Sequence, residues 1–379
     1  MRLYDPHSPN LQPRLYDVYR TLRDEHPIYN NPERDLWIVT RYDDVCAVLQ
    51  DPATFSSAEV EEAKLLMPMI VFMDDPTHAK HRTLLSKVFT PSRMAGLEGA
   101  VRASARNLFE NAAKQGRCDF MRAVASQLPS IVICQLIGIP EERRATFVEC
   151  TEMMIETGAD SHPIAEPAAK IYAEFEALLK ERRAERRDDL MSALLDAEVD
   201  GVGLSEQELL GFCFNLIIGG TDTTMNLLGN GTRLLWEHPE QREMLVGKPE
   251  LIPAAVEEML RIESPTQTLP RRPVRDVEIH GVTVPAQSRL LVCYGSANHD
   301  ERVYEEPDRF DITKQRDRHL AFGIGGHHCL GAALARLEGR VAFEELLGRF
   351  PTYRVEGTAE WVTSRWARSQ ASLVVELGT

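Results

Sequence analysis

Over much of the chain, apolar residues are spaced three and four positions apart, the pattern that buries one face of an α-helix. In the first half this spacing predicts successive helices, over residues 17–25, 43–49, 76–88, 92–115, 120–137, 141–156, 164–185 and 188–196. Proline and glycine mark the breaks between them. A β-branched run at residues 37–40 indicates a strand instead.

One predicted helix is much longer than the others. Ser205 is followed three residues later by Glu208, a capping-box pattern that marks a helix start, and the apolar segment behind it continues to Glu237. A helix of this length measures about 50 Å. We therefore expect it to cross a whole domain.

Strand patterns become frequent in the last third of the chain. Helices are predicted over residues 253–262 and 330–347, strands over 277–279, 282–284, 290–292 and 372–377, and a loop rich in charge, proline and glycine over 298–326. No repeat or low-complexity linker divides the sequence. We expect a single domain over residues 1–379, mainly α, with a long central helix and a small β-rich portion.

Charge and cysteine content narrow the class of protein. The 379 residues carry a net charge of −15, whereas a nucleic-acid binder would need a basic surface. The start of the sequence has no apolar stretch that would indicate a signal peptide or a membrane anchor. The seven cysteines form no C-x-x-C pair, so neither a disulfide framework nor a cysteine-rich zinc site is indicated. These features favour a cytoplasmic enzyme that acts on small molecules.

The segment from Phe322 to Gly331 is the most informative. It is a glycine-rich turn that delivers Cys329 to the start of a predicted helix. Glycine lets the backbone approach a flat ligand closely, and amides at a helix start stabilise a thiolate, which could ligate iron. The alternatives are a buried structural cysteine and, less well supported, a zinc cluster of His327, His328 and Cys329.

This segment resembles the heme-binding loop of the cytochrome P450 family, F-G-x-G-x-H-x-C-x-G, at every fixed position. The resemblance implies the cytochrome P450 fold, heme b as the cofactor, and Cys329 as the axial thiolate on the iron. It also implies that Phe322 packs beside the sulfur and that His327 binds a heme propionate. Gly323 and Gly331 are the motif glycines beside the cofactor.

The long central helix carries a second unusual segment, residues 218–224. Adjacent glycines, Gly219 and Gly220, cost roughly 1 kcal/mol each relative to alanine inside a helix, so something must compensate. Either the helix packs closely there and hydroxyls bond back to the preceding turn, or it opens to make room for oxygen. The segment resembles the family's A/G-G-x-D/E-T signature, which implies that Asp222 and Thr223 protonate the distal oxygen.

Three further features resemble the family by their position. Glu258 and Arg261 match its E-x-x-R helix; the same pattern occurs at residues 141–144 and 306–309, so spacing alone would not select it. Arg309 matches the partner arginine of a structural triad. His78 and Arg82, on one helix face, match a propionate-binding pair, and Arg271 matches another propionate arginine.

The resemblance implies a monooxygenase that inserts one oxygen atom from O2 into a terpenoid, steroid, fatty acid or polyketide. Its electrons would come from a separate ferredoxin-type donor with an NAD(P)H-dependent reductase, and we expect a monomer with no membrane or nucleic-acid partner. A peroxide-driven enzyme of the same fold and a non-catalytic heme protein are the alternatives. The donor is expected to dock near Lys80, Lys87, Arg336 and Arg340. Candidate substrate-pocket residues are Leu66, Met67, Met69, Ile70, Phe72, Phe214, Ile218, residues 266–269 and Trp366.

Overall fold

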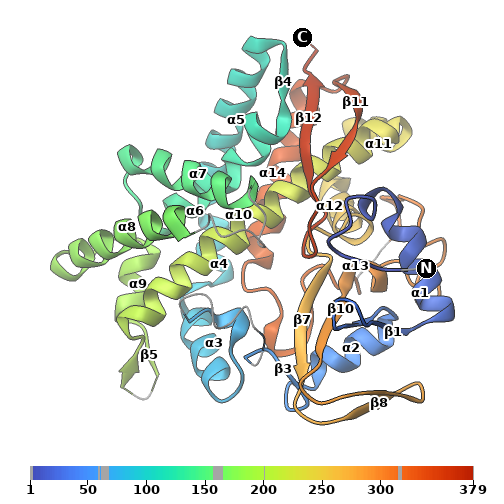
Figure 1. Cartoon of the computed structure of the whole chain (residues 1–379). Coiled ribbons are helices and arrows are strands. Elements are labelled where there is room, and N and C mark those ends of the chain that lie inside the picture. Colours follow the sequence, from blue (N-terminus) through green and yellow to red (C-terminus); the bar gives the residue numbers. More distant parts are fainter. Residues whose placement is uncertain are drawn as a thin grey trace.

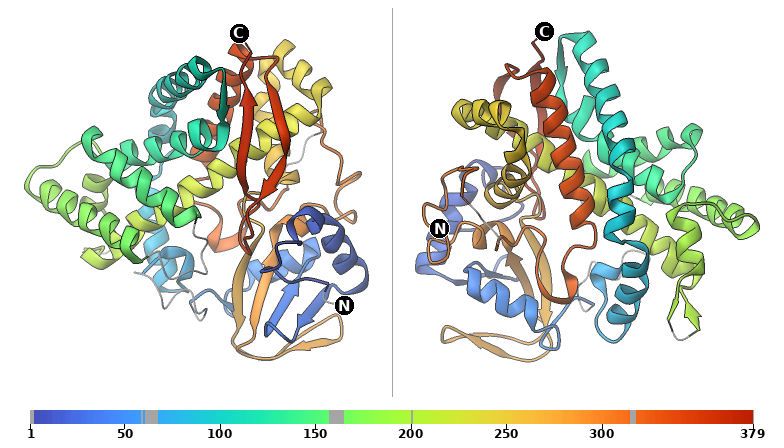
Figure 2. Two further views of the ribbon diagram at one scale, coloured as in Figure 1. Left: turned by 45° about the horizontal axis from the view of Figure 1, so that its top comes forward. Right: turned by 180° about the vertical axis from the view of Figure 1, so that it is seen from behind.

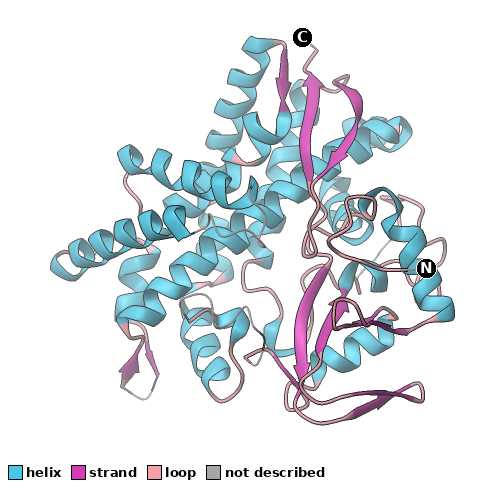
Figure 3. Cartoon of the chain, viewed as in Figure 1, coloured by secondary structure: helices cyan, strands magenta, loops and turns pink. Residues whose placement is uncertain are grey.

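The computed structural model describes residues 3–58, 60, 68–156, 165–199, 201–314 and 318–378. Helices predominate and gather on one side, with most strands on the other (Figures 1 and 3). The α-helices are α1 (Leu15–Glu25), α2 (Tyr42–Gln50), α3 (Thr77–Val88), α4 (Pro91–Gly96), α5 (Glu98–Gln115), α6 (Gln127–Ile137), α7 (Glu141–Glu156), α8 (Ala165–Ala184), α9 (Leu190–Asp196), α10 (Glu206–Glu237), α11 (Pro239–Gly247), α12 (Ile252–Ile262), α13 (Tyr294–Ala297) and α14 (Ala332–Arg349).

Short helical turns complete this list. They are the 3₁₀ turns η1 (Gln12–Arg14), η3 (Ile70–Phe72), η6 (Pro249–Leu251) and η7 (Gly325–His327), and the π-helical turn η4 (Met121–Ala125).

The largest sheet has the strand order β1-β2-β10-β7-β3. Strand β10 runs parallel to β2, and the other neighbours are antiparallel. A second sheet has the order β11-β12-β4, and two hairpins join β5 to β6 and β8 to β9. The bounds are β1 (Ile28–Asn31), β2 (Leu36–Val39), β3 (Phe55–Ser56), β4 (Arg117–Asp119), β5 (Glu198–Val199), β6 (Val202–Gly203), β7 (Thr268–Pro273), β8 (Val277–Ile279), β9 (Val282–Val284), β10 (Arg289–Cys293), β11 (Arg354–Trp361) and β12 (Gln370–Glu376).

Helix α10 is the centre of the helical portion. The predicted capping box is present: Ser205 Oγ accepts from the Glu208 amide, and Glu208 Oε2 accepts from the Ser205 amide at 2.7 Å. The largest apolar cluster contains residues of α5, α6, α8, α10, α12 and α14, and Figure 2 shows α10 and α14 crossing inside this group. Apolar burial on nearly all sides therefore fixes α10.

The main sheet packs between helices because alternate residues point to opposite faces. On strand β10, Leu290 and Val292 join the apolar cluster that includes Val45 of α2. Leu291 faces the other way and joins the cluster that includes Leu15 of α1.

Some predicted boundaries are wrong. The single helix expected over 92–115 is two helices, α4 and α5, because the chain turns at Leu97 after Gly96. The helix expected over 120–137 begins as a π-helical turn. The last long helix begins at Ala332, so Cys329 precedes it instead of starting it.

Candidate heme site

A series of hydrogen bonds shapes the loop of residues 320–331, which we call the cysteine loop. The Leu320 amide donates to Asn298 Oδ1 at 2.6 Å, and the Gly323 amide donates to the Leu320 carbonyl at 2.8 Å. The Cys329 amide then donates to the Phe322 carbonyl at 2.9 Å. These bonds fold the loop back on itself, and they leave the Cys329 side chain exposed.

Two loop glycines adopt backbone angles that other residues rarely adopt. Gly323 and Gly325 have φ values of 65° and 74°. A Cβ at Gly325 would also lie 2.8 Å from the Leu49 carbonyl oxygen. Glycine is therefore required at position 325 for the loop to approach α2 this closely.

The free Cys329 thiol is not pre-ionised by its surroundings. Desolvation by the surrounding protein raises its pKa, although the amides of Gly331 and Ala332 and the guanidinium groups of Arg82 and Arg336 act in the opposite direction. The expected help from helix-start amides is thus present but smaller than the cost of desolvation. A bound metal cation would supply the missing stabilisation of the thiolate.

The four residues matched to propionate binding lie close together. The rings of His78 on α3 and His327 in the cysteine loop stack with centroids 4.0 Å apart. Arg82 and Arg271 are near enough to His327 to lower its pKa. Among the described residues, Arg82 has no carboxylate partner, so this group could bind the carboxylates of a ligand.

The two histidines of this group are neutral donors or acceptors at neutral pH. Desolvation is the main cause that lowers the pKa of His327, to about 3, and it also lowers that of His78. Ser57, which no sequence motif indicated, lies with its hydroxyl 3.3 Å from His327 Nε2. Arg271 also donates to the Pro270 carbonyl at 2.7 Å, which fixes its direction.

The central glycines of α10 differ in their surroundings. A Cβ at Gly219 would meet nothing within 4 Å, whereas one at Gly220 would lie 2.8 Å from Ile133 Cδ1. The helix is continuous here, and Thr223 Oγ1 donates to the Gly219 carbonyl at 2.6 Å. The threonine hydroxyl therefore bonds back to the preceding turn, which is the first of the two explanations of this segment. Space beside Gly219 is present without an opening of the helix.

Asp222 lies next to Thr223 and is partly buried. Its Oδ1 accepts from Asn226 Nδ2 at 3.2 Å. Burial raises the pKa of Asp222 to about 6, and the Asn226 hydrogen bond opposes this shift. The carboxyl group can therefore gain and lose a proton near neutral pH.

Glu258 and Arg261 form a fully buried, two-point ion pair with both N···O distances 2.8 Å. Arg261 also donates to the carbonyls of Asn298 and Pro307, at 2.8 and 2.7 Å. The prediction that the Arg309 side chain completes a triad is wrong. Its backbone carbonyl accepts from Arg261 at 3.3 Å, while its exposed guanidinium pairs with Glu306.

Asn298 links this ion pair to the cysteine loop. Its carbonyl binds Arg261, and its side chain binds Leu320. Sequence reasoning missed this residue; the signal was a polar side chain at the head of the predicted loop, which is common and not specific.

Most cations expected to bind an electron donor already have partners. Arg336 forms a two-point ion pair with Glu257 and stacks on the Phe322 ring at 4.5 Å. Arg340 pairs with Glu98 and Glu344. Lys80 is exposed, and no acidic partner is found for it in the described part of the chain.

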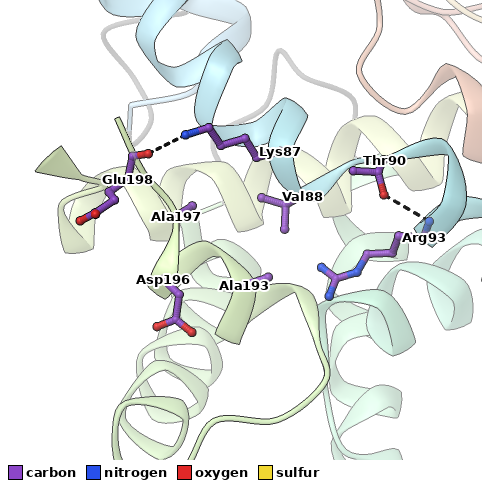
Figure 4. A pocket seen from close by; sticks show the side chains of 8 residues that line it. All are labelled: Lys87, Val88, Thr90, Arg93, Ala193, Asp196, Ala197 and Glu198. Atoms are coloured by element: carbon purple, nitrogen blue, oxygen red, sulfur yellow. Dashed lines mark hydrogen bonds between the residues drawn. The ribbon is translucent and has the colours of Figure 1, made fainter. Parts of the chain in front are cut away.

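Lys87, in the last turn of α3, lies at a surface groove. The groove has a volume of about 550 Å³, and Figure 4 shows the Lys87 ammonium donating to the Glu198 backbone carbonyl, at 2.8 Å. Arg93 and Asp196 also line it, so charges of both signs face the same space.

The predicted substrate-pocket residues fall into three groups. Leu66 and Met67 lie outside the described residues. Met69, Phe214, Gln267 and Thr268 are buried, and the Phe214 ring stacks on Tyr172 at 4.8 Å, which assigns Phe214 to core packing. The third group is partly exposed and consists of Ile70, Phe72, Ile218, Thr266, Leu269 and Trp366.

The residues present fit a heme group. The exposed Cys329 sulfur, the open space beside Gly219 and a cluster of donors for carboxylates suit an iron porphyrin held by one protein ligand. Among the described residues, no group of three His, Cys, Asp or Glu side chains could bind a metal ion by itself. Within the same residues, no helix is both long and apolar enough to cross a membrane.

Comparisons with known proteins agree with this geometry. The family model "Cytochrome P450" matches residues 246–370. The polyketide biosynthesis cytochrome P450 PksS of Bacillus subtilis is 34% identical, over 99% of this chain and 98% of the relative. Vitamin D(3) 25-hydroxylase of Pseudonocardia autotrophica is 38% identical, over 89% and 86%.

A solved structure shares the fold as well. Cytochrome P450 CYP109Q5 from Chondromyces apiculatus superposes with a TM-score of 0.93 and 37% identity, covering 98% of this chain and 97% of that chain. These relatives are similar along nearly the whole sequence, including the parts outside the matched family model. The chain therefore belongs to the cytochrome P450 family and is a heme b monooxygenase that acts on hydrophobic molecules.

Proposed function

We propose that Cys329 is the axial thiolate ligand of the heme iron and that Asp222 and Thr223 handle protons during the oxidation. The observation that carries this proposal is the accessible Cys329 sulfur with the basic cluster of His78, Arg82, Arg271 and His327 close by. Phe322 and the glycines 323 and 331 would shape the sulfur's surroundings, and Gly219 would leave room above the cofactor.

The bound heme supplies oxygen activation, and a thiolate ligand favours cleavage of the O–O bond. The chain supplies orientation and protons. Asp222 can exchange a proton near neutral pH, because burial raises its pKa to about 6. The Thr223 hydroxyl, held by its bond to the Gly219 carbonyl, can accept a hydrogen bond with its oxygen and pass a proton onward.

The experiment for the ligand is a carbon monoxide difference spectrum of the reduced protein. We expect the red-shifted band of thiolate ligation in the wild type and its loss in Cys329→Ala. Cys118→Ala is the matched control, because Cys118 is buried in strand β4 and should leave the band unchanged. A normal band in Cys329→Ala would overturn the assignment.

We also propose a ferredoxin-type electron donor with an NAD(P)H-dependent reductase. It would dock on the side of α3 and the cysteine loop, where Lys80 is an exposed cation. Arg336 and Arg340 contribute less than expected, because Glu257, Glu98 and Glu344 compensate their charges.

Lys80→Glu tests this docking surface. If Lys80 is a docking charge, its reversal should lower the donor's affinity several-fold and decrease the salt dependence of binding. Lys248→Glu is the control, since Lys248 follows α11, at the opposite end of the molecule from α3 (Figure 1). Titration of the ferric protein with reduced and oxidised ferredoxin, at more than one salt concentration, measures the affinity and its salt dependence. Equal effects of the two variants would exclude a docking role for Lys80.

The substrate is proposed to be a terpenoid, steroid, fatty acid or polyketide. The partly exposed apolar side chains of Ile70, Phe72 and Ile218 support a hydrophobic site. The names of PksS and of the vitamin D(3) 25-hydroxylase favour large polycyclic or polyketide molecules within this group. We further propose one functional domain over residues 1–379 that acts as a cytoplasmic monomer.

Two alternative functions make different predictions. A peroxide-driven enzyme would not need Asp222 and Thr223 as a proton relay, and its peroxide-supported turnover would exceed its donor-supported turnover. A non-catalytic heme carrier would show no substrate-dependent consumption of NAD(P)H with any competent donor.

A further inference from the structure

One side of α10 is accessible in the middle of an otherwise buried helix. Asn215, Ile218, Gly219, Asp222 and Thr223 are partly or fully accessible, and their spacing of three and four residues places them on one face. The segments 209–214 and 224–235, before and after this stretch, are buried. This accessible stripe therefore marks the side of the helix that faces the reaction space.

Asn215 is a polar residue at the N-terminal end of the stripe. Among the described residues its side-chain amide has no hydrogen-bond partner, and it is only partly accessible. Asparagine is a poor helix former, and its amide gains nothing from apolar surroundings. A residue that is unfavourable for both the helix and its packing is expected where it serves a ligand.

Another segment of the chain packs against α10 one helical turn before Asn215. One turn earlier, the Pro68 carbonyl lies so close to Gly211 that no side chain would fit between them. This contact brings the 3₁₀ turn η3, with its partly buried Ile70 and Phe72, over the same part of α10. The Asn215 amide thus lies one helical turn from this apolar contact, and a hydrogen bond to a ligand is stronger where apolar groups exclude water.

We infer that Asn215 is a specificity-determining residue, whose amide binds a hydroxyl or carbonyl oxygen of the substrate. The inference rests on the proposed function of the stripe as the oxidation site. Asn215 and Thr223 are eight residues apart, about 12 Å along the helix. The substrate class is therefore a large hydrophobic molecule with an oxygen function remote from the carbon that is oxidised.

This assignment also explains how an apolar site can select among substrates. Apolar contacts discriminate weakly between molecules of similar shape, whereas a hydrogen-bonding group in a dry site rejects an analogue that lacks the matching oxygen. Asn215 fixes which end of the substrate faces Thr223. Regioselectivity would then depend on the distance between the substrate's oxygen and its oxidised carbon.

A series of 1-alkylimidazoles tests the inference without knowledge of the substrate. The imidazole ring binds ferric heme and shifts its Soret band, so the dissociation constant of each ligand can be measured optically. The series contains pairs of equal chain length that end in either a hydroxyl or a methyl group, over a range of lengths. The ratio of the two dissociation constants within a pair reports a polar contact at that length.

In the wild-type holoenzyme we expect the hydroxyl ligand to bind at least tenfold more tightly than its methyl partner at one or two chain lengths. In Asn215→Leu this gain should disappear, since leucine has a similar size but no polar atom. Ile218→Leu is the matched control on the same stripe, and it should change both members of each pair equally. Ratios that are the same in the wild type and Asn215→Leu at every length would overturn the inference.

Failure of the proposed function gives a different result. If unsubstituted imidazole produced no Soret shift, or if the carbon monoxide band of thiolate ligation were absent, the heme site itself would be misassigned. A normal shift and band combined with unchanged ratios in Asn215→Leu would remove only the role of Asn215.

Discussion

Asp222 shows how one partly buried side chain combines chemistry with a cost in stability. Burial raises its pKa to about 6, so the folded protein holds the carboxyl proton more tightly than the unfolded chain, where aspartate titrates near 3.9. Between roughly pH 4 and pH 6 the wild type therefore loses folding free energy as the pH rises. A group useful for proton transfer is thus unfavourable for folding at neutral pH.

We predict that Asp222→Asn is more stable than the wild type at pH 7, by roughly 1–3 kcal/mol. Asparagine keeps an oxygen that can accept from Asn226, but it carries no charge to desolvate. Urea unfolding of the holoprotein at several pH values measures the difference, which should shrink toward pH 4. An advantage that grew as the pH fell would contradict the assignment of the raised pKa.

The glycines of α10 extend this argument to a whole element. A Cβ at Gly231 would lie 2.5 Å from Phe343 Cζ on α14 and 2.7 Å from Met259 Sδ on α12, whereas one at Gly219 would meet nothing. Gly231 lets α10, α12 and α14 approach each other, whereas Gly219 leaves space on the accessible stripe. Both are helix-interior glycines, and sequence spacing does not distinguish these roles.

We predict opposite results for two alanine substitutions in α10. Gly219→Ala should raise the stability of the heme-free protein by up to about 1 kcal/mol, because alanine is the better helix former, and it should weaken imidazole binding to the ferric holoprotein. Gly231→Ala should lower stability by about 1–3 kcal/mol through overpacking. Urea unfolding and optical titration measure both properties. A loss of stability in Gly219→Ala equal to that in Gly231→Ala would contradict the open space beside Gly219.

The same element shows what the sequence could predict. The capping box at Ser205 and the apolar run to Glu237 defined α10 almost to the residue, since local chemistry determines a helix start. Strand β7 was not predicted, because Pro270 and Pro273 interrupt its pattern and its pairing with β10 is a tertiary contact. The break between α4 and α5 was missed because one apolar pattern continues across Leu97.

At the scale of the whole molecule, motifs predicted which residues belong together but not how they touch. The clustering of His78, Arg82, Arg271 and His327 joins segments nearly 250 residues apart, and only resemblance to a family indicated it. Glu257, which pairs with Arg336, and Glu98, which pairs with Arg340, come from other helices, so this part of the compensation could not be inferred from one sequence.

The buried ion pair of Glu258 and Arg261 gives the last prediction, because it connects α12 to the cysteine loop through Asn298. Arg261→Met would remove the cation that faces the buried Glu258 carboxylate, and it would remove the donor to the carbonyls of Asn298 and Pro307. Breaking such a pair costs about 3–5 kcal/mol, and we expect most of the bound heme to be lost. Urea unfolding and the heme-to-protein absorbance ratio measure these effects.

Arg309→Met is the control that separates this pair from the expected triad. The Arg309 side chain is exposed and pairs only with the exposed Glu306 among the described residues, and exposed pairs contribute about 0–1 kcal/mol. Its backbone carbonyl, which binds Arg261, is unchanged by the substitution. We therefore expect nearly wild-type stability and heme content. A loss as large as that of Arg261→Met would mean that the Arg309 guanidinium, and not only its carbonyl, supports the cysteine loop.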